Sequence, residues 1–189
     1  MSSDDTTSPA AAGTDDGVRQ RLRAAVRDVP DFPKEGILFR DITTLLLDPE
    51  VHGLAVKALA DPFRESPPDQ ILGIESRGFI FGSTLALELN CGFVLARKPG
   101  KLPAEIEAVS YDLEYGSDSI EVHKDAIKPG AEVLVVDDLI ATGGTAKAAC
   151  DLVERLGGHV AAAVFLIELV GLNGRELLGE RPVLSILQY

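Results

Sequence analysis

Residues 133–145 read Val-Leu-Val-Val-Asp-Asp-Leu-Ile-Ala-Thr-Gly-Gly-Thr, an apolar run followed by two acids and a glycine turn. The apolar run indicates a strand buried on both faces, which is typical of a parallel sheet. We expect a helix over residues 146–156 after the turn. The N–H groups of such a turn and of a helix N-terminus favour an anion, so the pattern predicts a phosphate site.

The two adjacent acids, Asp137 and Asp138, stand between the expected strand and the turn. Open α/β sheets bind ligands at the carboxyl ends of their strands. Paired carboxylates beside a phosphate cradle therefore favour a phosphorylated sugar, with both acids near its hydroxyls. The structural alternative is an ordinary strand–turn–helix connection in which Thr142 or Thr145 only caps the helix. Carboxylates rarely lie near a core without a role, which favours the phosphosugar site.

The turn does not match two common nucleotide-binding motifs. It lacks the Gly-Lys-Ser/Thr of a P-loop and the G-x-G-x-x-G of a dinucleotide site.

The rest of the chain alternates short apolar segments with helical ones. We expect strands at 71–74, 91–96, 119–123, 160–167 and 183–187, and helices at 18–28, 50–64 and 79–89. Residues 29–40 are expected to be irregular, and residues 104–117 to form a long loop or a β-hairpin arm. This alternation predicts an α/β fold with a mostly parallel central sheet flanked by helices.

Length and composition bound the possibilities. The 189 residues fit a single domain over 18–189, preceded by an acidic tail at 1–17 whose composition predicts disorder. The net charge of −12 argues against binding nucleic acid or an anionic membrane surface. The longest apolar run, 160–167, is too short to span a bilayer. Cys91 and Cys150 show no metal or disulfide spacing, which favours a reducing, cytoplasmic location.

A second set of candidate residues is basic. Arg97, Lys98 and Lys101 follow an expected strand and should lie on the same rim as the acidic pair. A pyrophosphate would fit between these cations and a sugar, and Arg77 can add a bidentate contact to phosphate oxygens. The alternatives are a solvated basic cluster and a surface ion pair between Arg77 and Glu75, which would contribute little.

With these motifs in view, the chain resembles the adenine-specific branch of the type I phosphoribosyltransferase family. The resemblance covers about residues 18–189 and is carried by 133–145, Asp31-Phe32-Pro33, Gly36-Ile37-Leu38-Phe39-Arg40-Asp41-Ile42, Glu75-Ser76-Arg77-Gly78-Phe79, Arg97-Lys98-Pro99-Gly100-Lys101-Leu102-Pro103 and Tyr111-Asp112-Leu113-Glu114-Tyr115-Gly116. It implies the type I phosphoribosyltransferase fold with a small N-terminal hood, a cis peptide at Glu75–Ser76 and a homodimer. The implied reaction is purine salvage, in which adenine and phosphoribosyl pyrophosphate give AMP and pyrophosphate.

The resemblance also implies roles for individual residues. The 5′-phosphate would be held by Ala141, Thr142, Gly143, Gly144 and Thr145, and pyrophosphate by Ser76, Arg77, Arg97, Lys98 and Lys101. Asp137 and Asp138 would face the ribose hydroxyls and favour a ribosyl group that becomes cationic as pyrophosphate leaves. Mg²⁺ would be held mainly through phosphoribosyl pyrophosphate, without a direct protein ligand.

For the base, the resemblance points to Phe39 and Leu169 on the two faces of the purine, with the backbone of Leu38 and Arg40 at its edge. Phe39 and Leu169 could equally be core residues. Glu114 is the implied general acid/base, because adenine loses a proton as its N9 attacks the sugar. Closure of 104–123 over the substrates would exclude water.

Two other functions fit parts of the pattern. A sister transferase acting on hypoxanthine, guanine or xanthine would share the phosphosugar site and differ only around Phe39 and Leu169. A regulator that senses phosphoribosyl pyrophosphate and binds DNA would need a DNA-binding module and a basic surface, and the acidic chain argues against both.

Overall fold

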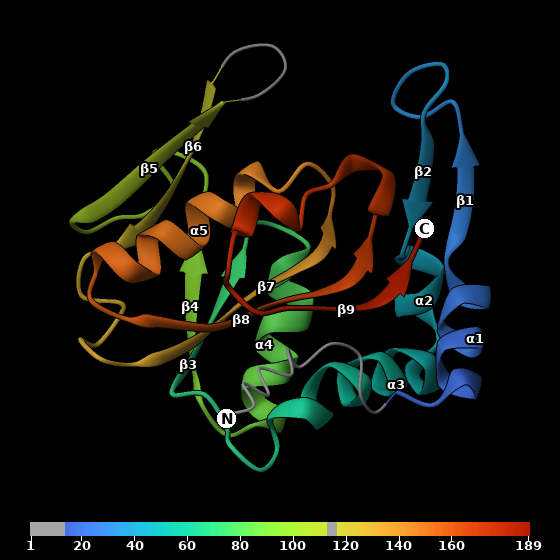
Figure 1. Ribbon diagram of the computed structural model, residues 1–189, viewed down its shortest axis with the longest axis horizontal. Coiled ribbons are helices and arrows are strands. Elements are labelled where there is room, and N and C mark those ends of the chain that lie inside the picture. The colour runs from blue at the N-terminus through green and yellow to red at the C-terminus, as the bar shows by residue number, and fades with distance from the viewer. Residues whose placement is uncertain (1–13, 113–116) are drawn as a thin grey trace, which may run out of the picture.

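The computed structural model describes residues 14–112 and 117–189, and its core is a sheet of five parallel strands. Their order across the sheet is β4-β3-β7-β8-β9, and their bounds are β3 Gln70–Ile74, β4 Gly92–Ala96, β7 Glu132–Ile140, β8 His159–Glu168 and β9 Val183–Gln188. The predicted parallel sheet is confirmed (Figure 1).

Helices cover both faces of this sheet, as a doubly buried sheet requires. Along β7, Leu134 and Val136 join one core cluster, while Val133 and Val135 join the other. Successive side chains of a strand point to opposite faces, so the apolar run supplies both cores at once. The first cluster packs against α3 (Pro49–Ala60) and α4 (Gly78–Glu88), and the second against α5 (Gly144–Arg155).

The N-terminal segments form the predicted hood beside the sheet. It contains α1 (Asp16–Ala25), β1 (Arg27–Pro30), β2 (Leu38–Asp41) and α2 (Thr43–Leu47). The expectation of an irregular stretch over 29–40 is wrong, because β1 and β2 pair as an antiparallel hairpin. No residue of its two strands is buried and Pro30 ends β1, so the hairpin lacks the apolar alternation that identifies a strand.

The start of the hood differs slightly from the predicted domain boundary. Helix α1 begins at Asp16 and its N-cap is Asp15, whose carboxylate accepts a hydrogen bond from the N–H of Gly17. The last residues of the expected tail are therefore ordered, and residues 1–13 lie outside the described part of the chain.

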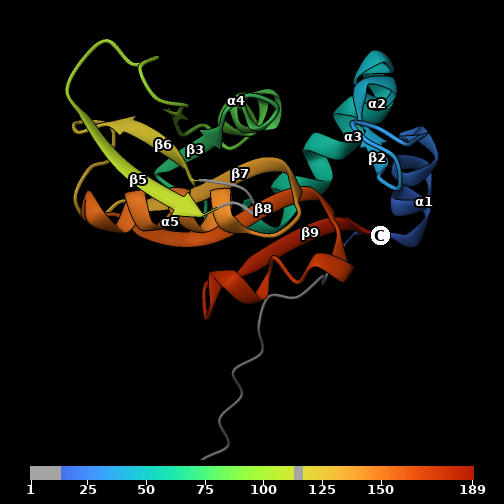
Figure 2. The ribbon, with the colours of Figure 1, turned by 90° about the horizontal axis from the view of Figure 1, so that it is seen from above.

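A second hairpin, β5 (Ile106–Asp112) and β6 (Ser117–His123), forms the arm that the sequence offered as one of two alternatives. Val109, Ile120 and Val122 on this arm pack into the same core cluster as α5. Figures 1 and 2 both place the arm and the hood hairpin on opposite sides of the central sheet.

The strand order contains a switch point between β3 and β7. From β3 the chain continues to β4 on one side, and from β7 it continues through β8 to β9 on the other. In open α/β sheets a ligand crevice forms at the carboxyl ends of two such strands. The residues that follow β3 and those that end β7 are therefore the ones placed to bind a ligand.

The described part of the chain also contains short 3-10 helices at Asp61–Phe63, Val170–Leu172 and Glu176–Leu178. Among the described helices, none has both the length and the apolar character needed to cross a bilayer.

Candidate active site

The acidic pair lies inside β7, which continues to Ile140 and does not end before the acids. Asp138 is 3% exposed, and its Oδ2 accepts a hydrogen bond of 2.5 Å from Nε of Arg77. Arg77 comes from the turn after β3, so this ion pair joins the two strands of the switch point. The alternative pairing of Arg77 with Glu75 is wrong, because Glu75 binds other cations.

The second acid, Asp137, has a pKa raised well above its ordinary value. Burial is the main cause, since it disfavours the charged carboxylate, and the negative charge of adjacent Asp138 adds to it. Oδ1 of Asp137 also accepts a hydrogen bond of 2.8 Å from the backbone N–H of Asp138. The pair combines a charged acceptor with a carboxyl that takes up a proton readily, which suits contact with sugar hydroxyls.

The predicted phosphate loop surrounds a cavity of about 110 Å³. The cavity is lined by Asp137 and by residues 139–146. Gly143 is the N-cap of α5 and has a left-handed backbone with φ of +84°, and no side chain caps the helix. The alternative in which Thr142 or Thr145 only caps the helix is therefore wrong. The N-terminus of α5 opens onto the cavity.

A turn far along the chain supports this loop. A Cβ on Gly174 would lie 2.2 Å from the carbonyl oxygen of Ala141, and one on Gly143 would lie 2.3 Å from the carbonyl oxygen of Gly174. Two backbones pack here at a distance that only glycine permits. No local pattern of residues marks Gly174, because its partners Ala141 and Gly143 are more than thirty residues away in the chain.

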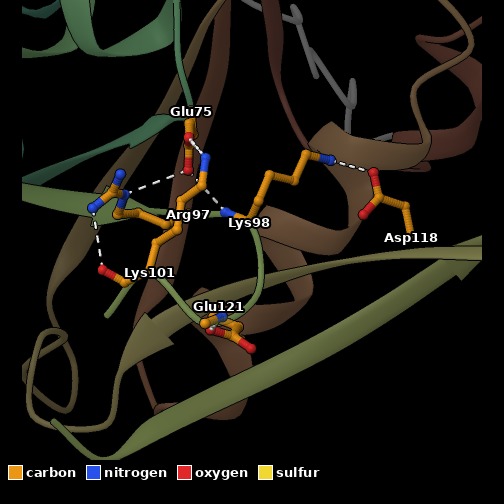
Figure 3. Close-up of polar contacts among 7 residues, drawn as sticks. Glu75, Arg97, Lys98, Lys101, Asp118 and Glu121 are labelled. Atoms are coloured by element: carbon orange, nitrogen blue, oxygen red, sulfur yellow. Dashed lines mark hydrogen bonds and ion pairs between the residues drawn. The ribbon is translucent and has the colours of Figure 1, made fainter. Parts of the chain in front are cut away.

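The basic cluster converges on Glu75 (Figure 3). The Lys101 ammonium forms an ion pair with the Glu75 carboxylate, and Nε of Arg97 lies 3.4 Å from Glu75 Oε2. That same oxygen accepts a hydrogen bond of 2.9 Å from the backbone N–H of Lys98. Burial by itself would raise the pKa of Glu75, but the hydrogen bonds from Lys101 and from the Lys98 N–H, with the charges of Lys101 and Arg97, hold this pKa below its ordinary value. The basic residues are thus not merely a solvated cluster.

The third cation, Lys98, reaches the arm. Its ammonium forms an ion pair with Asp118 (Figure 3). The same ammonium lies 2.7 Å from the hydroxyl of Tyr111. Asp118 keeps the pKa of Lys98 above its ordinary value against the effect of burial. The basic loop is therefore fastened to both the sheet and the arm.

The turn between β3 and α4 joins the acidic pair and the basic cluster. Glu75 binds the cations, the exposed Ser76 follows, and Arg77 binds Asp138. The peptide bond between Glu75 and Ser76 is cis, as the resemblance implied.

The purine candidates lie at the junction of hood and sheet. The ring of Phe39 packs edge-on against Phe32 at 5.2 Å, and its centroid lies 5.8 Å from the Arg77 guanidinium carbon. Leu38 is exposed, and Arg40, on the other side of Phe39 in the chain, forms an ion pair with Asp28. The hood thus brings Phe39 beside the residue that binds Asp138.

On the sheet side, Leu169 follows β8 and donates its N–H to the carbonyl oxygen of Ile140 at 3.0 Å. This bond places Leu169 next to the start of the phosphate loop. Leu169 is half-buried and also packs against the core, so its location fits both roles that the sequence left open.

A buried carboxylate anchors the segment around Leu169. Glu168 is 6% exposed and receives hydrogen bonds from the Arg175 guanidinium at 2.9 and 2.6 Å and from the Ser185 hydroxyl at 2.5 Å. These contacts, led by the Arg175 hydrogen bonds, lower the pKa of Glu168 to about 2. The network fixes Leu169 and Gly174, which are the chain neighbours of its two charged members.

We predict that Glu168→Gln destabilises the protein in a pH-dependent way. A folded-state pKa of about 2, against 4.5 when unfolded, stabilises the fold by about 3 kcal/mol at neutral pH. Because this pKa is depressed, the contribution is fully present above pH 4.5 and is lost as the pH falls toward 2. Urea unfolding at pH 7 and pH 3 should show a smaller difference between variant and parent at pH 3. The exposed Glu180→Gln is the control, and an equal difference at both pH values would contradict the prediction.

Glu114, the implied general acid/base, lies outside the described residues. Over residues 14–112 and 117–189, no group of three or more His, Cys, Asp or Glu side chains is placed to hold a metal ion. Two carboxylates of the site are engaged by cations, Asp138 by Arg77 and Glu75 by Lys101.

Residues 45–176 match the family model described as the phosphoribosyl transferase domain. An adenine phosphoribosyltransferase from Methylococcus capsulatus is 57% identical over 169 residues, which cover 89% of this chain and 99% of the relative. The chain belongs to the adenine phosphoribosyltransferase family. This result confirms the resemblance and the enzyme class that the motifs indicated.

Solved structures of adenine phosphoribosyltransferases share the fold. The one from Rhodothermus marinus has a TM-score of 0.88 at 53% identity, covering 93% of this chain and all of its own. The one from Saccharomyces cerevisiae, solved with an iminoaltritol bisphosphate and adenine, has a TM-score of 0.86 at 45% identity, covering 90% of this chain and 99% of its own.

Proposed function

We propose that this protein is a purine salvage enzyme that transfers the 5-phosphoribosyl group of phosphoribosyl pyrophosphate to adenine, giving AMP and pyrophosphate. One observation carries the proposal. The Arg77–Asp138 ion pair bridges the β3–β7 switch point directly beside the cavity formed by residues 139–146. This arrangement provides carboxylates, cations and a phosphate cradle within one crevice.

The phosphoribosyl group would occupy this crevice with its 5′-phosphate on the loop. Residues 141–145 would hold the phosphate through backbone N–H groups and the hydroxyls of Thr142 and Thr145. Asp137 and Asp138 would receive hydrogen bonds from the ribose hydroxyls. As the bond from C1′ to pyrophosphate breaks, the negative charge of Asp138 would stabilise the positive charge that develops on the ribosyl group, and Asp137 would add to this effect in its ionised form.

The leaving pyrophosphate would bind the cations around Glu75. Ser76 and Arg77 from the turn, with Arg97, Lys98 and Lys101 from the basic loop, are the groups we assign to it. Phosphate oxygens would replace the carboxylates of Glu75 and Asp118 as partners of the lysines. The cations then offset the charge that pyrophosphate gains on leaving.

Mg²⁺ fits this site as an ion carried mainly by the substrate. It prefers phosphate oxygens and water to an all-protein cage, and the engaged Asp138 and Glu75 carboxylates agree with that preference. When bound to phosphoribosyl pyrophosphate, it would supply further neutralisation of the leaving group.

Adenine would lie between Phe39 of the hood and Leu169 at the end of β8, with the backbone of Leu38 and Arg40 at its edge. The position of Phe39 beside Arg77 supports this assignment, because it brings the base-binding wall to the phosphoribosyl site. As N9 bonds to C1′, the N9 proton would pass to the carboxylate of Glu114. Closure of 104–123 over the substrates would keep water from competing with adenine.

A panel of bases tests the proposed reaction. Adenine, hypoxanthine, guanine and xanthine are each incubated with phosphoribosyl pyrophosphate and Mg²⁺, and pyrophosphate release is followed. We expect pyrophosphate release with adenine and with none of the other three bases. If the protein uses a 6-oxopurine and does not use adenine, our proposal is wrong and the protein is a sister transferase.

The proposed role of Glu114 has its own test. Glu114→Ala should lower kcat more than it weakens binding of phosphoribosyl pyrophosphate, because the carboxylate is needed only for the proton. A variant with the parent's kcat would remove Glu114 from the mechanism and leave the adenine assignment intact.

We further propose a homodimer that uses the face formed by α3 and α4. Leu87 is 85% exposed on this face, and a groove of about 440 Å³ runs between the two helices. An exposed leucine beside an open groove favours burial by a second copy. Light scattering should give twice the mass of one chain, and Leu87→Asp should halve it; a parent protein with the mass of one chain would refute the dimer.

The location we propose is the cytoplasm. The free thiols of Cys91 and Cys150 support a reducing compartment. Cell fractionation with an antibody to the protein tests the location.

A further inference from the structure

Tyr189 extends the pairing of β8 with β9 past the end of β9. Its N–H donates to the carbonyl oxygen of Glu168, and its carbonyl oxygen accepts from the N–H of Val170, both at 3.0 Å. These two bonds lie on either side of Leu169 in the chain. The backbone of Tyr189 therefore holds the segment that carries one proposed wall of the purine site.

The ring of Tyr189 contacts two arginines of the hood. The guanidinium carbon of Arg40 lies 4.0 Å from the ring centroid, and that of Arg23 lies 4.4 Å from it. Cations at these distances are attracted to an aromatic face. Arg23 also donates a hydrogen bond of 2.7 Å to the carbonyl oxygen of Gln188.

Arg40 is fixed in this position by the hood hairpin. Its guanidinium forms an ion pair with Asp28, which lies opposite Arg40 in the register of β1 and β2. The preceding residue, Phe39, points to the other face of β2, because neighbours in a strand alternate. It contacts Phe32 and lies near Arg77, while Arg40 lies over Tyr189.

We propose that Tyr189 is a positioning residue for the purine site. Its backbone holds Leu169 on the sheet, and its ring holds Arg40 and thus Phe39 on the hood. A single residue therefore sets the separation between the two walls of the site, through its backbone on the sheet and its ring on the hood. This inference rests on the proposed function, which places adenine between Phe39 and Leu169.

Loss of the Tyr189 ring should affect binding of the base and leave binding of phosphoribosyl pyrophosphate intact. The phosphate loop and the basic cluster are built from other elements, at the end of β7 and after β4, and neither contacts Tyr189 through the bonds described above. Loss of the ring should loosen the hood and weaken adenine binding while phosphoribosyl pyrophosphate still binds.

Three substitutions separate this role from a merely structural one. Tyr189→Phe keeps the aromatic face, Tyr189→Leu keeps apolar bulk without it, and Tyr189→Ala removes both. We expect Tyr189→Leu and Tyr189→Ala to raise KM for adenine about tenfold, with KM for phosphoribosyl pyrophosphate within about twofold of the parent. Tyr189→Phe should behave like the parent in both. If the alanine variant does not fold, as judged by thermal unfolding, the leucine variant carries the test.

Two results would overturn the inference: an unchanged KM for adenine in the leucine variant, or an equal rise in both KM values. The parent enzyme, measured first, decides the proposed function separately. If the parent used another base, the proposed function would fail, and the ratio of variant to parent KM for that base would still test Tyr189.

Discussion

Asp138→Asn is expected to lower kcat/KM with adenine by about 10²- to 10³-fold while the protein stays folded. Asparagine has the same shape and keeps an oxygen that accepts the Arg77 hydrogen bond, so the link between β3 and β7 survives. What it removes is the negative charge. That charge is buried at the switch point, where little solvent screens it, so its effect on a cationic ribosyl group is large.

The same substitution should change the neighbouring acid. Asp138 is one cause of the raised pKa of Asp137, so its neutralisation should lower that pKa. Carboxyl carbon chemical shifts followed by NMR during a pH titration would show the change directly.

Asp61→Asn is the matched control for activity, because Asp61 is an exposed acid that pairs with Arg64 away from the crevice. We expect it to leave kcat/KM unchanged. Near-parental kcat/KM in Asp138→Asn would refute the proposed role of this carboxylate.

Gly174→Ala should weaken binding of AMP and phosphoribosyl pyrophosphate by about 100-fold, similar to the loss of several backbone hydrogen bonds to a charged group. Its Cβ would lie 2.2 Å from the carbonyl oxygen of Ala141 and 2.9 Å from the backbone nitrogen of Gly143. Both contacts are to backbone, which cannot rotate away as a side chain can. The phosphate loop must therefore shift, and its N–H groups no longer converge on the phosphate.

The control for this variant lies three residues earlier. A Cβ on Gly171 meets nothing within 4 Å, so Gly171→Ala should bind AMP as the parent does. Titration calorimetry with AMP gives the affinities, and circular dichroism confirms the fold. An AMP affinity within about threefold of the parent in Gly174→Ala, less than 1 kcal/mol, would show that the contact does not set the loop geometry.

Much of the central fold could be predicted from local pattern. The run Val133–Val136 and the glycine turn at Gly143 predicted a buried parallel strand followed by a helix, because both cores of the sheet draw on consecutive apolar residues. The hood hairpin escaped prediction for the opposite reason. No residue of its two strands is buried, so the sequence there lacks the alternation of apolar and polar residues that marks a half-buried strand.

The candidate site divides in the same way. Asp137, Asp138 and the loop that follows them are contiguous, so their motif could be recognised without a structure. The partner of Arg77 could not be predicted in this way, because Asp138 is sixty-one positions away and Glu75 is nearer in the chain. The structure instead gives Glu75 to the basic loop.

The sequence by itself determined the class of fold and the family, and it located the glycine turn of the proposed phosphate loop, because each depends on residues that are neighbours along the chain. Only the tertiary structure decided which charges pair, and how Gly174 and Tyr189 support the loop and the hood. Such contacts arise when the strand order brings segments that are distant in the sequence to one edge of the sheet, and no local pattern of residues shows which segments will meet there.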